Sequence, residues 1–210
     1  MTITSRVVRR ARRTGLTIYT RRQWHSKSPH IYAWRRVYRK HKIIPHGPVD
    51  TVWQHITVTR DTGVTPKSFK SDMLTLEKIG NERFGSGISY NFGVDMQTGE
   101  IGVGQPLDAA GTHTLNDKNV ETPSGQRLSY NQNYVSIAIA MIGMPGAIPS
   151  IKAQRAVATL LRCLIEEGVV TKKFDYLPHS WVAPKDCPTQ PVRDVMPYIR
   201  KRAISRHSKR

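Results

Sequence analysis

Residues 134–142 form a run of nine positions that are nearly all apolar or small. A strand of this composition is typical of the centre of a sheet, where both faces are covered, and not of an edge that faces water. Around it, strand-like and helix-like patterns alternate, with a strand at 51–59 and an apolar-periodic helix at 150–167. The sequence therefore predicts an α/β (α+β) fold in which helices pack on a central mixed sheet.

The net charge of +18 is concentrated at the two ends of the chain. Residues 1–50 carry +12 and residues 199–210 carry +6, so residues 51–198 are neutral. Basic ends of this kind are typical of anion-binding segments added to a folded domain. We therefore divide the chain into a basic N-terminal extension at 1–50, a domain at 51–198 and a basic tail at 199–210, and expect residues 1–20 to be weakly ordered.

Residues 178–188 combine a histidine, a lysine and one of only two cysteines with three prolines. Histidine and cysteine are ligands that zinc prefers, and prolines restrict the backbone enough to hold ligands in place. The alternative is a proline-rich surface loop with an incidental cysteine. His55, in the predicted strand at 51–59, is a candidate third ligand, although a lone histidine on a sheet is more often only hydrogen-bonded.

The two cysteines, Cys163 and Cys187, form no disulfide framework, which fits folding in a reducing cytosol. Cys163 lies in the predicted apolar helix, where we expect it to be a buried small hydrophobic residue. The sequence begins with arginines that no apolar stretch follows, and no run approaches ~18 apolar residues. We therefore expect neither a signal peptide nor a membrane span.

Several segments follow one another in an order that is known from one enzyme family. Arg22-Gln23-Trp24 weakly matches the Arg-x-x-Trp opening of its recognition-protein branch. The stronger matches are the strand that carries His55, then residues 88–94, 111–114 and 133–143, and finally His179 with Ala183-Pro184-Lys185-Asp186-Cys187-Pro188.

In this order the segments resemble the zinc-dependent N-acetylmuramoyl-L-alanine amidases, most closely the phage-lysozyme type, and are similar to the peptidoglycan recognition proteins. The resemblance covers roughly residues 50–198, and its most specific part is the Ala-Pro-Lys-x-Cys-Pro segment. It implies a sheet of about five or six strands with a zinc site in a groove on one face. Residues 51–198 would then be the amidase catalytic domain.

The resemblance implies that His55, His179 and Cys187 ligate a Zn²⁺ ion. Three protein ligands leave a fourth position open for water, as in catalytic zinc sites. Tyr90 and Lys185 would be catalytic, because a hydroxyl and an ammonium can both donate to the oxyanion that develops on the amide. The alternatives are a core aromatic residue at 90 and one more surface lysine at 185.

The resemblance also implies a set of substrate-binding residues. His113 would line the groove without ligating zinc, and the alternative is an ordinary loop histidine. Asn91 and Thr57 would lie close to the substrate. Asn133 would take the place of the family asparagine, displaced by a polar surface loop inserted at 115–132.

The activity implied is hydrolysis of the amide between N-acetylmuramic acid and L-alanine in bacterial peptidoglycan. Without a signal peptide, we expect a monomeric phage endolysin that stays in the host cytoplasm until its release to the wall, or a virion-associated lysin. The alternative is a non-catalytic peptidoglycan-binding module, or a virion component whose basic arms bind nucleic acid non-specifically.

The basic ends would bring the protein to anionic wall polymers or lipid. Within the N-terminal extension, one face of a predicted short basic helix carries apolar residues, which either pack on the core or leave the helix free to bind such surfaces. These residues are Ile31, Trp34, Val37 and Tyr38.

Overall fold

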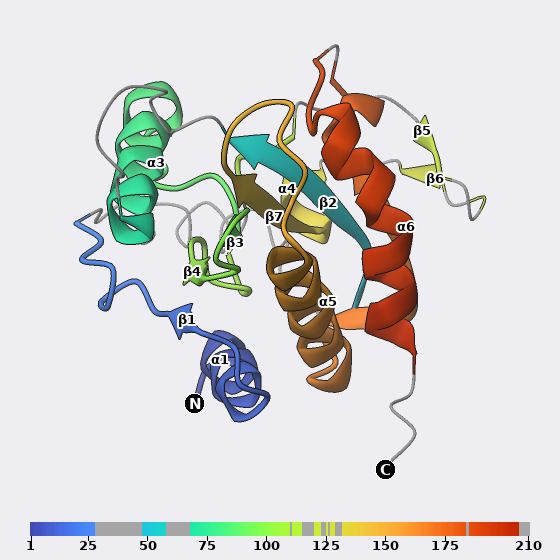
Figure 1. Cartoon of the computed structure of the whole chain (residues 1–210), viewed down its shortest axis with the longest axis horizontal. Helices are drawn as coiled ribbons and strands as arrows, with labels where there is room; N and C mark the ends of the chain where they lie inside the picture. The colour runs from blue at the N-terminus through green and yellow to red at the C-terminus, as the bar shows by residue number, and fades with distance from the viewer. Residues whose placement is uncertain are drawn as a thin grey trace.

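In the computed structural model the chain folds around one six-stranded sheet (Figure 1). The structure describes residues 1–27, 48–57, 68–109, 111–114, 120–122, 125, 127–128, 132–183 and 185–205. The predicted basic helix around Trp34 and the residues predicted beyond Thr57 in the His55 strand lie outside the described residues.

The sheet is mixed, because β3 and β4 pair antiparallel while the other neighbours are parallel. This confirms the predicted architecture. In spatial order the strands are β1 (Ile18–Tyr19), β4 (Ile101–Val103), β3 (Phe92–Asp95), β7 (Ile137–Ile142), β2 (Val49–Thr57) and β8 (Val170–Pro178). A separate two-stranded sheet joins β5 (Val120–Glu121) to β6 (Arg127–Leu128), inside the stretch predicted to be loop.

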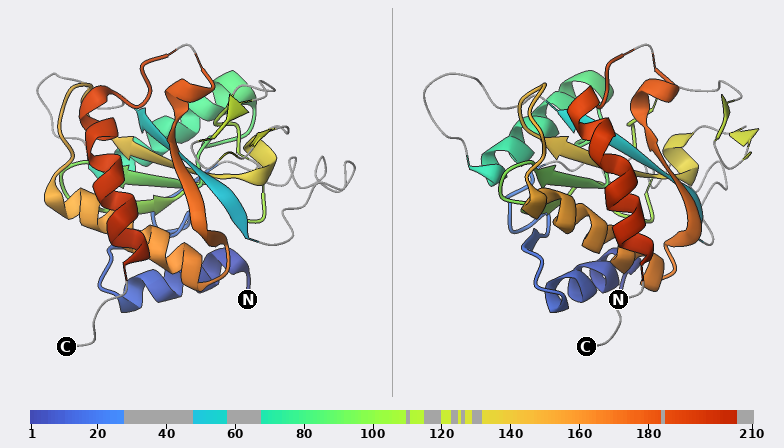
Figure 2. Two further views of the ribbon diagram at one scale, coloured as in Figure 1. Left: turned by 90° about the vertical axis from the view of Figure 1, so that its right-hand side faces the viewer. Right: turned by 45° about the vertical axis from the view of Figure 1, so that its right-hand side comes forward.

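The helices pack on both faces of the sheet (Figure 2). They are α1 (Ile3–Arg13), α3 (Phe69–Phe84), α4 (Gln132–Val135), α5 (Ile151–Glu166), the 3₁₀ turn η1 (His179–Trp181) and α6 (Gln190–Ile204). Helix α5 lies where the sequence predicts an apolar helix at 150–167, and α6 covers residues 191–202, whose pattern predicts a terminal helix. None of the described helices is long and apolar enough to cross a membrane.

The two faces of the sheet differ in the size of their side chains. One face carries Val52, Phe92, Ile139 and similar residues, which pack with α1, α5 and α6 in the largest apolar cluster. On the other face, the residues in register with His55 are Ala140, Gly93 and Gly102. Small residues there let α3 approach the sheet closely, since added Cβ atoms at Gly93 and Gly102 would lie 2.7 and 2.6 Å from Met73 of α3.

The sequence of this region predicts a helix with Pro66 in its first turn and Gly80 near its end, and the boundaries of α3 differ from that prediction. The helix begins at Phe69, because the Ser68 hydroxyl caps it by accepting from Ser71 N. It continues past Gly80 to Phe84 and ends at Gly85, whose left-handed φ of 62° favours glycine.

The expectation of weak order in residues 1–20 is wrong. Helix α1 is capped by Thr2, and Val7, Val8 and Ala11 on one face are buried against the main core. The Thr4 hydroxyl accepts from Leu107 N at 3.0 Å, which fixes the helix to the loop after β4. Strand β1 then joins the sheet as an edge strand. The N-terminal segment is thus part of the fold, and a domain boundary at residue 50 stays a prediction.

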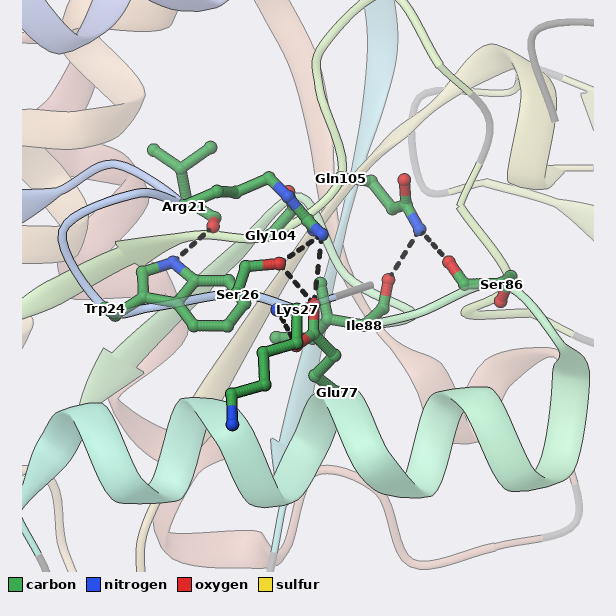
Figure 3. A network of polar contacts seen from close by, with 10 residues as sticks. Arg21, Trp24, Ser26, Lys27, Glu77, Ser86, Ile88, Gly104 and Gln105 are labelled. Atoms are coloured by element: carbon green, nitrogen blue, oxygen red, sulfur yellow. Dashed lines mark hydrogen bonds and ion pairs between the residues drawn. The ribbon is translucent and has the colours of Figure 1, made fainter. Parts of the chain in front are cut away.

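Glu77 of α3 connects the segment after β1 to the rest of the fold (Figure 3). Its buried carboxylate accepts from the Arg21 guanidinium at 3.0 Å and from Lys27 N at 2.8 Å, and it also bonds the Ser26 hydroxyl. Burial lowers the pKa of Arg21, while the charge of Glu77 opposes that shift. Nearby, the buried Trp24 indole donates to Val103 O at 2.8 Å.

We predict that Glu77→Gln lowers the free energy of unfolding by about 2–4 kcal/mol, because it leaves the partly buried Arg21 guanidinium without its counter-charge. The matched control is Glu82→Gln on the same helix. Glu82 is exposed, and among the described residues its ion pair is with Lys78 at 3.8 Å, so the control should change the free energy by less than about 0.5 kcal/mol. Urea unfolding followed by circular dichroism measures both, and equal effects would contradict this account.

Candidate metal centre and groove

Two parallel strands bring the two predicted histidine ligands together. Strand β2 pairs with β8 so that Trp53 faces Leu177 and Gln54 faces Pro178. The residues that follow are His55, near the end of β2, and His179, the first residue of η1 after β8, and they lie side by side. Their ring centroids are 4.4 Å apart.

Cys187 reaches the same point through the loop after η1. Ser180 N donates to Cys187 O, which folds the loop back toward its start. The Cys187 Sγ lies 3.9 Å from His55 Nδ1 and accepts from Ile56 N at 3.5 Å. Ligand atoms of His55, His179 and Cys187 all lie within 4.8 Å of one another. The structure therefore brings the predicted ligand set together.

Burial sets the protonation of these three side chains. It lowers the pKa of His55 well below its usual value, and it lowers the pKa of His179 to about 4, with the charge of Lys185 adding to the shift. Both imidazoles are thus neutral at physiological pH. Burial raises the pKa of the Cys187 thiol, while the hydrogen bond from Ile56 opposes the increase.

This donor set fits a zinc ion. The Nε2 atoms of His55 and His179 are buried, and neither has a hydrogen-bond partner among the described residues. Neutral imidazoles can ligate zinc directly, and a thiol does so by releasing its proton.

A pocket of about 410 Å³ opens beside His179, one of the three candidate ligands. It includes Tyr90 and Lys185, the two residues predicted to be catalytic, together with His179. The Tyr90 ring lies 4.9 Å from the His55 ring, and burial raises the pKa of Tyr90, so its hydroxyl stays protonated at neutral pH. The remaining lining residues are Leu76, Ile79, Gly80, Arg83, Phe84, Ser89, Thr112, His113, Thr114 and Asn133.

His113 lines this pocket and is outside the group of three close ligand atoms. Its ring centroid is 5.6 Å from that of His55, and burial lowers its pKa to about 3. The side-chain oxygen Oδ1 of Asn133 accepts from His113 N at 2.7 Å and from Thr114 N at 2.9 Å. Glycine is required at 111, since an added Cβ would lie 2.4 Å from His113 Cδ2. Gly111 and Asn133 therefore both serve to position His113 in the pocket.

Asn91 and Thr57 do not line the pocket. The buried Asn91 amide accepts from Ala138 N at 2.9 Å and donates to Gln105 O at 3.4 Å, so it connects neighbouring backbone segments. Thr57 is buried at the end of β2, on the same face as His55. A substrate-binding role for these two residues stays a prediction.

Two contributions to the site were not found from the sequence. Helix α3 forms one wall of the pocket, and no local pattern indicates which face of the sheet a helix will cover. The second is a buried pair behind His55. Gln54 Nε2 donates to His55 O at 2.7 Å and to Ile139 O at 3.2 Å, and Tyr176 OH bonds Gln54 Oε1. This pair holds the backbone that presents His55.

Comparison with known proteins adds a family and a fold. A family model described as N-acetylmuramoyl-L-alanine amidase matches residues 45–190. No curated protein matches the sequence.

Among solved structures, the peptidoglycan recognition protein PGRP-SA of Drosophila has a TM-score of 0.64 at 22% identity, covering 86% of this chain and 90% of that one. Drosophila PGRP-LB has a TM-score of 0.63 at 18% identity, with coverages of 91% and 97%. The peptidoglycan recognition protein LE in complex with tracheal cytotoxin, a monomeric diaminopimelic acid-type peptidoglycan, has a TM-score of 0.65 at 20% identity, with coverages of 87% and 93%. At these identities the likeness shows the fold alone.

We predict that one thiol of the metal-free protein reacts more rapidly than the other with a thiol reagent and that one equivalent of Zn²⁺ protects it. The more reactive thiol is Cys187, because it is partly exposed, whereas Cys163 is only 1% exposed and burial raises its pKa to about 11. Cys187→Ser should remove the rapid reaction and weaken zinc binding by roughly 100-fold or more. Cys163→Ala is the control and should keep both properties. A rapid thiol that zinc fails to protect would exclude Cys187 as a ligand.

Proposed function

The chain belongs to the N-acetylmuramoyl-L-alanine amidase family, and we propose that it is a zinc-dependent enzyme that hydrolyses the amide between N-acetylmuramic acid and L-alanine in peptidoglycan. The observation that carries this proposal is the convergence of His55, His179 and Cys187, together with a pocket that His179 lines along with Tyr90 and Lys185. A module that only holds peptidoglycan needs the pocket but has no use for three converging ligands. Three protein ligands are typical of catalytic zinc sites, which keep a position open.

His55, His179 and Cys187 would hold the ion, and zinc bound there supplies Lewis-acid polarisation of the amide and an activated water. The protein's own contribution is to place donors around the carbonyl oxygen. Lys185 is exposed and lines the pocket together with His179. Tyr90, whose hydroxyl is protonated, lines the same pocket from the segment just before β3. Together they would stabilise the negative charge that develops on that oxygen.

The rest of the pocket suits a sugar–peptide chain. Leu76, Ile79 and Phe84 of α3 offer an apolar wall, while the other side is polar. Both ring nitrogens of His113 are buried without a hydrogen-bond partner among the described residues, so they can bond a substrate amide. The complex of a similar fold with tracheal cytotoxin supports a peptidoglycan fragment as the ligand.

The second candidate function is peptidoglycan binding without cleavage, which the likeness to recognition proteins favours. The two functions differ in whether the amide is cut. An endolysin or virion-associated role, with release from the host cytoplasm to the wall, is a further proposal that follows the resemblance to phage amidases.

We predict that the protein releases peptides with a free L-alanine N-terminus from purified peptidoglycan, as measured by mass spectrometry of the digest. A chelator should abolish this release, and Zn²⁺ should restore it. New reducing sugar ends instead would mean a glycosidase, and retention on the wall without products would mean a binding module.

Tyr90→Phe and Lys185→Met should each lower kcat by roughly 100-fold, the size expected for losing one oxyanion donor. Both should leave zinc binding intact. The controls are Tyr198→Phe and Lys172→Met, at exposed positions away from the pocket. If either pocket variant kept full activity, that residue would have no catalytic part.

A further inference from the structure

The arginines of α1 are divided between two faces of the helix. Arg6 and Arg10 point toward the end of α5, where Arg10 contacts Glu167 at 2.6 Å and Glu166 at 2.9 Å. Arg6 lies 3.6 Å from Glu167. These two arginines fix the helix to α5, and their charges are matched by acids.

The other face of α1 carries Arg9, Arg12 and Arg13, which the spacings of three and four residues place together. They line a pocket of about 750 Å³ together with Arg21 and Arg22 from the segment after β1. The remaining lining residues are Thr2, Thr4, Ser5, Val8, Thr20, Val103, Pro106 and Asp108. Five arginines therefore face a pocket whose lining contains one acid, Asp108.

Two of these arginines are held by the protein itself. Arg12 donates to Ile18 O at 2.9 Å, and Arg21 bonds Glu77. Arg9, Arg13 and Arg22 are exposed, and no carboxylate of the described residues pairs with them. Like charges around one pocket repel unless an anion lies between them, so the pocket is suited to a ligand with several negative charges.

The other lining residues restrict the chemistry of that ligand. The lining includes the hydroxyl residues Thr2, Ser5 and Thr20, which can bond phosphate and polyol oxygens, and it includes no aromatic residue on which bases could stack. A membrane-inserting helix would need a free apolar face, but Val7 and Ala11 of α1 are buried in the core.

We propose that the pocket between α1 and the segment after β1 binds a polyol-phosphate chain of the bacterial envelope, with successive phosphates held by the arginines. The pocket shares no lining residue with the proposed amidase groove. In Figures 1 and 2, α1 lies at the bottom of the molecule and α3, which walls the groove, lies near the top. The proposal thus adds a second binding site to the proposed hydrolysis and does not depend on it.

The test is a calorimetric titration of the full chain with poly(glycerol phosphate) at several salt concentrations. The triple variant Arg9→Gln, Arg13→Gln, Arg22→Gln should bind at least tenfold more weakly, and its salt dependence should have a log–log slope smaller by about two. The control triple Arg155→Gln, Lys172→Gln, Lys173→Gln removes the same charge from exposed positions and should change Kd by less than about threefold. Unchanged melting curves confirm that all variants are folded.

Three outcomes would overturn the proposal. Equal losses in the two triple variants would mean attraction by net charge alone. Single-stranded DNA with the same number of phosphates, bound as tightly, would mean a nucleic-acid site. Tight binding to vesicles of anionic lipid, without binding to the polymer, would mean a membrane surface. Chelator-treated protein should bind the polymer as the untreated protein does, so a failure of the amidase proposal is distinguishable from a failure of this one.

Discussion

The site depends on the parallel register between β2 and β8. Because Gln54 faces Pro178, the residues that follow them, His55 within β2 and His179 at the start of η1, lie side by side. A shift of one residue along either strand would turn one of these side chains to the opposite face, where the large aliphatic residues pack. Gln54 resists such a shift, since its amide is bonded by Tyr176 on β8 and reaches the backbone of β7. The two candidate histidine ligands are therefore positioned by the buried pairing of β2 with β8.

The site also depends on a row of small residues that lies in register with His55 on one face of the sheet. A groove needs space above the sheet, and the row formed by Ala140, Gly93 and Gly102 beside His55 provides it. Helix α3 uses part of that space to pack through Met73, and its later turns wall the pocket. The opposite face is filled with large apolar residues under α5 and α6, which belong to the largest apolar cluster.

The sequence predicts the parts of this arrangement that local pattern and ligand chemistry specify. The central strand and the helices α5 and α6 are of this kind, because their signals lie in residue type and short-range spacing. The candidate ligands His179 and Cys187 stand out by their chemistry within one short segment, whereas His55, which is distant in sequence, joins them through the family resemblance. Local pattern does not specify which helix walls the groove, or that the Asn91 amide is taken by the backbone. The sequence also gives no sign that residues 1–20 are well ordered, because the contacts that order them are not local. Arginines obscure the few apolar positions of α1, and its charge partners Glu166 and Glu167 are distant in sequence.

The position of α1 also changes how the basic charge of the N-terminal segment can act in binding. A free basic arm attracts any polyanion, with a strength set by charge and salt. When the same arginines are fixed on a helix that is pinned to α5 and to the loop after β4, their spacing becomes part of the recognition. A rigid set of guanidinium groups loses less conformational entropy on binding than an arm that must first become ordered. Selectivity for regularly spaced phosphates would then come from the same contacts that stabilise the fold.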